Sequence, residues 1–144
     1  MFTRTFSLIL ASLLLILLAG LNILAFRYFW YWQWWWFDLL MHSTGGLAIG
    51  LVVNALTWRN GEAVVWWKPL VLAATSALII GLGWELFEFT LDRSARLAVV
   101  VKSMKTLQLG WYDTVTDLLS GVIGSIVGGL LTVVGQISKN KLTQ

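Results

Sequence analysis

Residues 6–26 read FSLILASLLLILLAGLNILAF, an almost unbroken run of Leu, Ile and Ala bounded by Arg4 and Arg27. A helix of about 20 mainly apolar residues is long enough to span the hydrocarbon core of a bilayer. The run therefore predicts a transmembrane helix. Because it holds only two serines and one asparagine, we expect this helix to face mostly lipid.

Three more apolar stretches of similar length follow, at residues 37–57, 69–91 and 113–137. Of the 144 residues, 58% are hydrophobic and 12% are charged, whereas soluble domains carry about 25% charged residues. Tryptophans crowd the segments 28–36 and 58–67 between these stretches, and tryptophan concentrates at membrane interfaces. The sequence thus predicts an all-α integral membrane protein, one domain that forms a bundle of four transmembrane helices.

Composition also excludes several function classes. The chain has no cysteine, so disulfides, thiolate metal sites and cysteine nucleophiles are absent. The net charge is +3, but the basic residues lie at the span edges, where they meet lipid headgroups. We therefore expect membrane lipids and no nucleic acid as partners. The glycine-rich fourth span leaves a membrane-protein partner or a homo-oligomer open, because small residues favour close helix packing.

The acidic residues gather at one level of the membrane. Six of the seven, and the only histidine, lie on the second, third and fourth spans or at their ends. Because successive spans alternate in direction, these residues fall near the face opposite to the two termini. At 1.5 Å per residue, His42, Glu85, Glu88 and Asp117 lie roughly 5–10 Å inside that face. Ionisable groups at such depth are costly, which marks them as a functional site.

The spacing of these residues places them on matching helix faces. Members of each set are three or four residues apart and therefore share one face. The sets are Asp38 with His42, Glu85 with Glu88, and Asp113 with Asp117. Glycine and alanine continue the same faces, as they do where membrane helices pack closely. We expect the polar side chains to point into the bundle and to share one site.

Buried carboxylates require protons, arginine partners or a metal ion. We predict a divalent metal ion whose ligands are Asp38, His42, Glu85, Glu88, Asp113 and Asp117. Oxygen donors suit Mg²⁺, Mn²⁺ and Ca²⁺, and the single imidazole keeps Zn²⁺ and Fe²⁺ open. The alternative is a metal-free network of shared protons in which Arg93 and Arg96 neutralise two acids. In that alternative Asp113 caps the fourth helix.

The order of these motifs is similar to that of two known families. The motifs are Asp38-x-x-x-His42, Trp84-Glu85-x-x-Glu88, and Asp113-Thr114-x-x-Asp117 with Gly124 seven residues later. Between about Trp35 and Gly129 the sequence resembles the YjdF-like family of the bacterial inner membrane. More distantly it resembles the VanZ-like family, which is named for a teicoplanin-resistance protein.

The resemblance implies a membrane protein of four to six spans with an acidic site, located in the bacterial inner membrane. The VanZ-like similarity implies a link to the cell envelope and to glycopeptide tolerance. One position departs from the pattern. Four residues after the position of Asp117 the YjdF-like pattern has another acid and VanZ-like proteins have Asn, whereas this chain has Gly121. The resemblance therefore implies one ligand fewer here.

Two function classes follow from these residues. In the first, a metal-dependent enzyme acts on a lipid or lipid-linked substrate, and the metal polarises a phosphoryl or ester oxygen and activates water. His42 or Glu85 would be the general base, and Arg93 and Arg96 would hold a phosphate. In the second, the protein is a structural or accessory bundle whose acidic cluster shares protons, forms ion pairs or binds a partner. An enzyme requires an open ligand position, whereas a structural site is closed.

Overall fold

The structure is a computed structural model that describes residues 3–57, 65–97 and 110–142, without the side chains of 92, 94–97 and 139–142. Every element in these ranges is an α-helix. The helices are α1 (Arg4–Tyr28), α2 (Trp30–Gln33), α3 (Phe37–Thr57), α4 (Trp67–Leu97) and α5 (Trp111–Leu142). Four of them are long and apolar enough to cross a membrane, and they contain the four predicted spans. The predicted all-α membrane bundle is confirmed.

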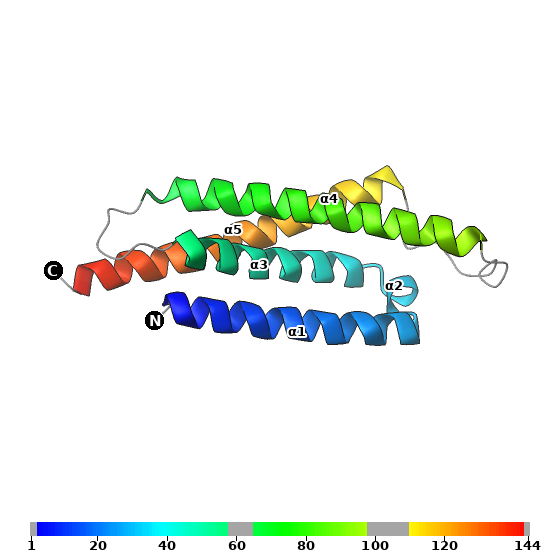
Figure 1. Ribbon diagram of the computed structural model, residues 1–144, viewed down its shortest axis with the longest axis horizontal. Coiled ribbons are helices and arrows are strands. Elements are labelled where there is room, and N and C mark those ends of the chain that lie inside the picture. The colour runs from blue at the N-terminus through cyan, green and yellow to red at the C-terminus, as the bar shows by residue number, and fades with distance from the viewer. Residues whose placement is uncertain (1–2, 58–64, 98–109, 143–144) are drawn as a thin grey trace.

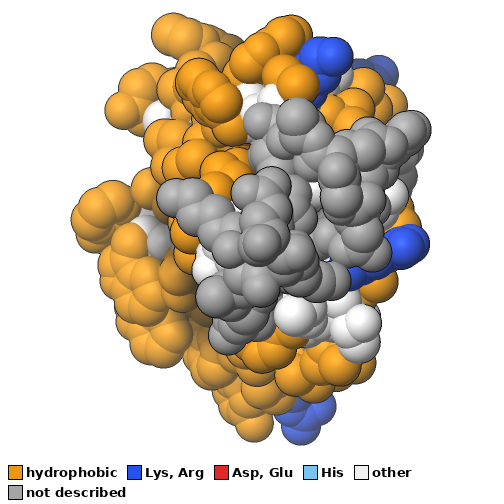
Figure 2. All heavy atoms as spheres, turned by 90° about the vertical axis from the view of Figure 1, so that its left-hand side faces the viewer, with side chains coloured by type: hydrophobic (Ala, Val, Ile, Leu, Met, Phe, Trp, Pro, Cys, Tyr) orange, Lys and Arg blue, Asp and Glu red, His pale blue; other side chains and the backbone are white. Residues whose placement is uncertain are grey.

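The four long helices alternate in direction, so both termini lie at one end of the bundle (Figure 1). We call the opposite end the site end; there α1 and α4 end and α3 and α5 begin. Figure 2 views the molecule from the end that holds the termini. Apolar side chains form most of the described surface in this view, Lys and Arg are visible, and no described acidic side chain is visible.

Helix α3 is the centre of the bundle and contacts α1, α4 and α5. Its contact with α5 brings the two backbones together. A Cβ added to Gly124 would lie 2.8 Å from the carbonyl carbon of Ser43, and one added to Gly50 would lie 2.9 Å from that of Ser125. Real Cβ atoms essentially never approach within 3.0 Å. Glycine at these positions is therefore what permits α3 and α5 to pack so closely.

Helix α1 covers α3 on one side and faces lipid on the other. Only 11% of an apolar 18-residue stretch of this helix is buried inside the protein. Ala11 and Ala25 are fully buried, whereas Ile16 and Ile23 are each 70% exposed. The expectation that the first span faces mostly lipid agrees with this arrangement.

An aromatic cluster closes the site end between α1 and α3. Phe29 has a φ of 60° and ends α1, and its N–H donates to the carbonyl of Ala25. The chain then turns through α2, where the rings of Trp30 and Tyr31 lie 5.6 and 5.1 Å from the ring of Phe37. Phe37 is only 3% exposed. This packing fixes the start of α3, so it also fixes the position of Asp38.

Two helix boundaries differ from the sequence expectation. Helix α4 does not end at Leu91 but continues to Leu97, because this extension holds no Gly or Pro and includes good helix formers. Arg93 and Arg96 therefore lie on helical turns and not in a loop. Helix α5 begins at Trp111, so Asp113 lies inside its first turn and is not the capping residue. An acid in the first turn interacts favourably with the helix dipole.

Candidate metal centre

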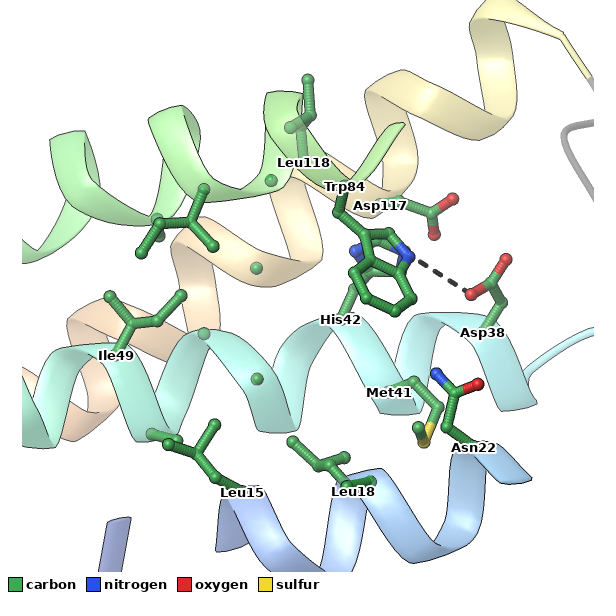
Figure 3. Close-up of a pocket in the computed structure, with 18 of the residues that line it drawn as sticks. Leu15, Leu18, Asn22, Asp38, Met41, His42, Ile49, Trp84, Asp117 and Leu118 are labelled. Atoms are coloured by element: carbon green, nitrogen blue, oxygen red, sulfur yellow. Dashed lines mark ion pairs between the residues drawn. The ribbon is translucent and has the colours of Figure 1, made fainter. Parts of the chain in front are cut away.

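Helix α3 presents Asp38 and His42 on consecutive turns of one face. The imidazole Nε2 of His42 lies 3.5 Å from Asp38 Oδ1, as the dashed line in Figure 3 shows. The side chains are 9% and 19% exposed, respectively. At 3.5 Å the two groups are close enough for electrostatic attraction and too far for a strong hydrogen bond.

Helix α4 brings two glutamates to the same imidazole. Glu85 Oε1 lies 3.9 Å from His42 Nε2, and Glu85 and Glu88 are each only 4% exposed. Hydrogen bonds orient both carboxylates. The indole N–H of Trp84 donates to Glu88 Oε1 over 2.8 Å, and the hydroxyl of Thr114 donates to Glu85 Oε2 over 2.7 Å. The second bond joins α4 to α5.

Helix α5 contributes Asp117, which is 1% exposed. Possible ligand atoms form two groups, and the atoms within each group all lie within 4.8 Å of one another. One group consists of Asp38, His42 and Asp117, and the other of His42, Glu85 and Glu88. His42 is common to both groups. Five predicted site residues from three helices thus meet at one place, as Figure 3 shows for Asp38, His42 and Asp117.

Two atoms of this cluster are buried without a hydrogen bond. Nε2 of His42 and Oδ2 of Asp117 have no hydrogen-bond partner among the described residues. More than nine tenths of buried polar groups in proteins have such a partner. Both residues belong to the group formed with Asp38. The cluster therefore has the donor atoms and the unmet bonding capacity that suit a cation.

Other predicted site residues lie outside these two groups. Asp113 is half-buried in the first turn of α5, and its hydrogen-bonded neighbour is Thr116, whose hydroxyl donates to the Asp113 carbonyl. Arg93 is exposed on α4. The side chain of Arg96 lies outside the part of the chain that the structure describes. Arg93 forms no ion pair with the cluster among the described contacts.

A cleft of about 740 Å³ opens beside the cluster. Its walls come from α1, α3, α4 and α5, and its lining includes Asp38, His42 and Asp117. Tyr31 also lines it. Burial raises the pKa of the Tyr31 hydroxyl above its usual range, and the Asp38 and Glu88 carboxylates raise it further. Tyr31 therefore keeps its proton and offers the cleft a neutral hydroxyl.

Two supporting residues were not predicted as part of the site. Trp84 and Thr114 hold Glu88 and Glu85, although neither can ligate a metal well itself. Both stand inside the sequence motifs. Trp84 is four residues before Glu88, a spacing at which helical side chains meet. No comparable signal exists for Thr114, because its partner is on another helix.

A family model described as "Predicted membrane protein (DUF2238)" matches residues 1–137. The chain belongs to this family. DUF2238 is the YjdF-like family, so that resemblance is confirmed. The match includes α1, which corrects the expectation that similarity begins near Trp35. No curated protein and no solved structure matches the chain. The VanZ-like similarity stays a prediction.

Gly121 occupies the position at which the resemblance to the YjdF-like pattern implies another acid in this DUF2238 protein. Gly121 lines the cleft, and a Cβ added there would lie 3.6 Å from the carbonyl oxygen of His42. This is an ordinary contact distance, so a side chain could start there without moving the backbone. Glycine therefore leaves this wall of the cleft open next to His42.

Proposed function

We propose that this DUF2238 protein binds a divalent cation at the site end, with Asp38, His42, Glu85, Glu88 and Asp117 as its ligands. The observation that carries the proposal is the pair of buried atoms without hydrogen bonds, His42 Nε2 and Asp117 Oδ2. A cation between them would satisfy both and would neutralise carboxylates that are costly to bury. Asp113 lies one helical turn before Asp117 on α5, and its carboxylate would attract the cation.

The donor set indicates the class of cation. Four carboxylates and one imidazole supply mainly oxygen, which suits Mg²⁺ or Mn²⁺ better than soft metals. Hydrogen bonds from Trp84 and Thr114 hold two of the carboxylates. Such outer partners orient metal ligands, and their loss typically costs 10–100-fold in metal affinity or activity.

The neighbouring cleft supports the enzyme version of this proposal over a closed structural site. Catalytic metal sites keep a position open for water or substrate, and the cleft reaches Asp38, His42 and Asp117. The reaction that fits best is hydrolysis of a phosphoester in a lipid headgroup. A bound divalent cation would polarise the phosphoryl oxygen and make a bound water more acidic.

The side chains of this protein would do the remaining work. In the hydrolysis, water bonds to phosphorus, the bond between phosphorus and the lipid alcohol oxygen breaks, and a proton passes from water to that alcohol. Glu85 or His42 would hold the proton in transit, through an atom that the cation does not bind. Arg93 and Arg96 lie three residues apart on α4, a spacing that puts them on one face, where they would attract the phosphate.

Polar groups deeper in the bundle support a one-sided site in place of a transmembrane ion path. The amide of Asn54 donates to the Gly50 carbonyl of its own helix, and the hydroxyl of Ser125 donates to Val122. These groups serve the backbone, and neither lines the cleft. The YjdF-like family supports a bacterial inner membrane as the location.

Metal analysis of the purified protein tests the proposal. Tag-free protein in detergent would be stripped with chelator, equilibrated with Mn²⁺, freed of unbound metal and analysed for bound manganese. We expect stoichiometric Mn²⁺ in the wild type and its loss in His42→Ala and Glu85→Gln. Thr116→Val is the matched control, because the Thr116 hydroxyl bonds only backbone carbonyls of α5. Folded wild type without manganese, or full retention in His42→Ala, would contradict the proposal.

A further inference from the structure

The cleft beside the cluster is polar at one end only. Its described polar lining residues all lie toward the site end of their helices: Asn22, Tyr31, Asp38, His42, Trp84 and Asp117. The rest of the cleft runs toward the other end of the bundle between apolar side chains such as Leu15, Val53 and Ile80. Figure 3 shows the carboxylates at one end of this cleft and Leu15 and Ile49 at the other.

The dimensions of the cleft suit a single hydrocarbon chain. On α3 the lining extends from Asp38 to Val53, which corresponds to roughly 22 Å at 1.5 Å per residue. One leaflet of a bilayer is about 15 Å deep in its hydrocarbon part, so an acyl chain fits lengthwise. The volume of the cleft is about 740 Å³, and over roughly 22 Å of helix length it forms a long, narrow space.

A thin, flexible occupant suits this cleft better than a packed helix does. An α-helix with side chains is about 10–12 Å across, so its cross-section is about 80 Å² or more. A flexible hydrocarbon chain, which is far thinner than a helix, can enter.

We propose that the cleft between α1, α3 and α4 holds one hydrocarbon chain of a phosphate-bearing membrane lipid, with its phosphate at the cation. This inference rests on the proposed function and adds the place where the hydrocarbon chain of the lipid would bind. The polar end then matches the anionic headgroup through the cation, and the apolar remainder matches the chain. Helix α1 forms one wall of the cleft, so it contributes to lipid binding although it carries no predicted ligand.

Gly45 offers a way to close the cleft without disturbing the cation ligands. It lines the cleft, and a Cβ added there would meet only Leu18 Cδ1, at 4.0 Å. Leucine at this position would project into the space that the chain needs. Gly20 is the matched control, because it lies outside the cleft lining and a Cβ there meets nothing within 4 Å. Ile49→Phe, which adds bulk farther along the cleft, serves if Gly45→Leu fails to fold.

The experiment uses hexadecyl phosphate with a photoreactive diazirine near the end of its chain. Full-length protein in phosphatidylcholine vesicles with Mn²⁺ would be irradiated, and labelled residues would be mapped by mass spectrometry. We expect labels on the apolar half of the cleft, at residues such as Val53 and Ile80. Gly45→Leu should lower this labelling about tenfold or more, equivalent to about 1.4 kcal/mol, with unchanged Mn²⁺ binding. Gly20→Leu should change neither.

Two outcomes would overturn the inference. One is labelling spread over the outer faces of the helices, such as Ile16 and Ile23, in the same proportion as the cleft. The other is equal labelling by hexadecanol carrying the same diazirine, with no effect of chelator on the phosphate probe, which would remove the role of the headgroup. Mn²⁺ binding is measured separately on each variant. Wild type that binds no Mn²⁺ would refute the proposed function, whereas wild type that binds Mn²⁺ but is not labelled in the cleft would refute only this inference.

Discussion

The close approach of α3 and α5 makes a testable prediction about the cation site. Alanine at position 124 would place its Cβ 2.8 Å from the carbonyl carbon of Ser43, and nearer still to the carbonyl oxygen. Ordinary contact begins at 3.4 Å. Relief of the carbon contact alone requires the helices to separate by about 0.6 Å, and the nearer oxygen requires more; neither backbone can yield as a flexible side chain would. Ser43 adjoins His42, so this separation also moves His42 away from Asp117.

The magnitude follows from two opposing effects. Overpacking typically costs about 1–3 kcal/mol, and we expect a backbone clash to lie at the upper end. Replacing glycine by alanine in a helix returns about 1 kcal/mol. The net expectation for Gly124→Ala is a loss of about 2 kcal/mol. Gly121→Ala on the same helix has an ordinary contact at 3.6 Å, so it should gain up to about 1 kcal/mol.

Unfolding of each variant in mixed detergent micelles, followed by tryptophan fluorescence, measures this difference. We expect Gly124→Ala to be about 3 kcal/mol less stable than Gly121→Ala. Mn²⁺ affinity should fall with it, because metal sites tolerate ligand displacements of only about 0.2 Å. Equal stability of the two variants, or Gly124→Ala with normal Mn²⁺ affinity, would refute the argument that glycine packing sets the site geometry.

Three further predictions follow from single hydrogen bonds. Thr114→Val removes the bond to Glu85 and should lower Mn²⁺ affinity about 10–100-fold, whereas Thr116→Val should bind as the wild type does; titration calorimetry compares them. Trp84→Phe removes the bond to Glu88 and should weaken Mn²⁺ binding without unfolding the protein, so a normal affinity would exclude a supporting role for the indole. Asn54→Leu replaces a buried amide whose Oδ1 has no hydrogen-bond partner among the described residues. The unfolding free energy of this variant should therefore be unchanged or higher. A loss of about 2 kcal/mol or more would show that this oxygen has a partner in the membrane.

Much of this architecture could be predicted because membrane constraints act on short sequence patterns. Span length follows from bilayer thickness, and the depth of His42, Glu85 and Asp117 follows from their distance to the span ends. Spacings of three and four residues placed the ligands on common faces. These local rules were sufficient to bring five of the six predicted ligands into two groups within 4.8 Å.

Features that depend on tertiary packing could not be predicted in the same way. The bond from Thr114 to Glu85 requires the relative position of α4 and α5, which spacing along one helix does not determine. The continuation of α4 past Leu91 was not predicted because the apolar stretch ends there, although the following residues include good helix formers. The cleft was also missed, because it lies between several helices, and the only polar residue with which α1 lines it is Asn22.

The proposed metal centre requires a cation held by His42, and the chain contains only one histidine. Pulsed electron paramagnetic resonance of the tag-free protein loaded with Mn²⁺ detects nitrogen nuclei bonded to the metal. We predict a single imidazole nitrogen coupling in the wild type that disappears in His42→Gln. Mn²⁺ bound without any nitrogen coupling, or no bound Mn²⁺ in a folded protein, would contradict the assignment of this cluster as a metal centre.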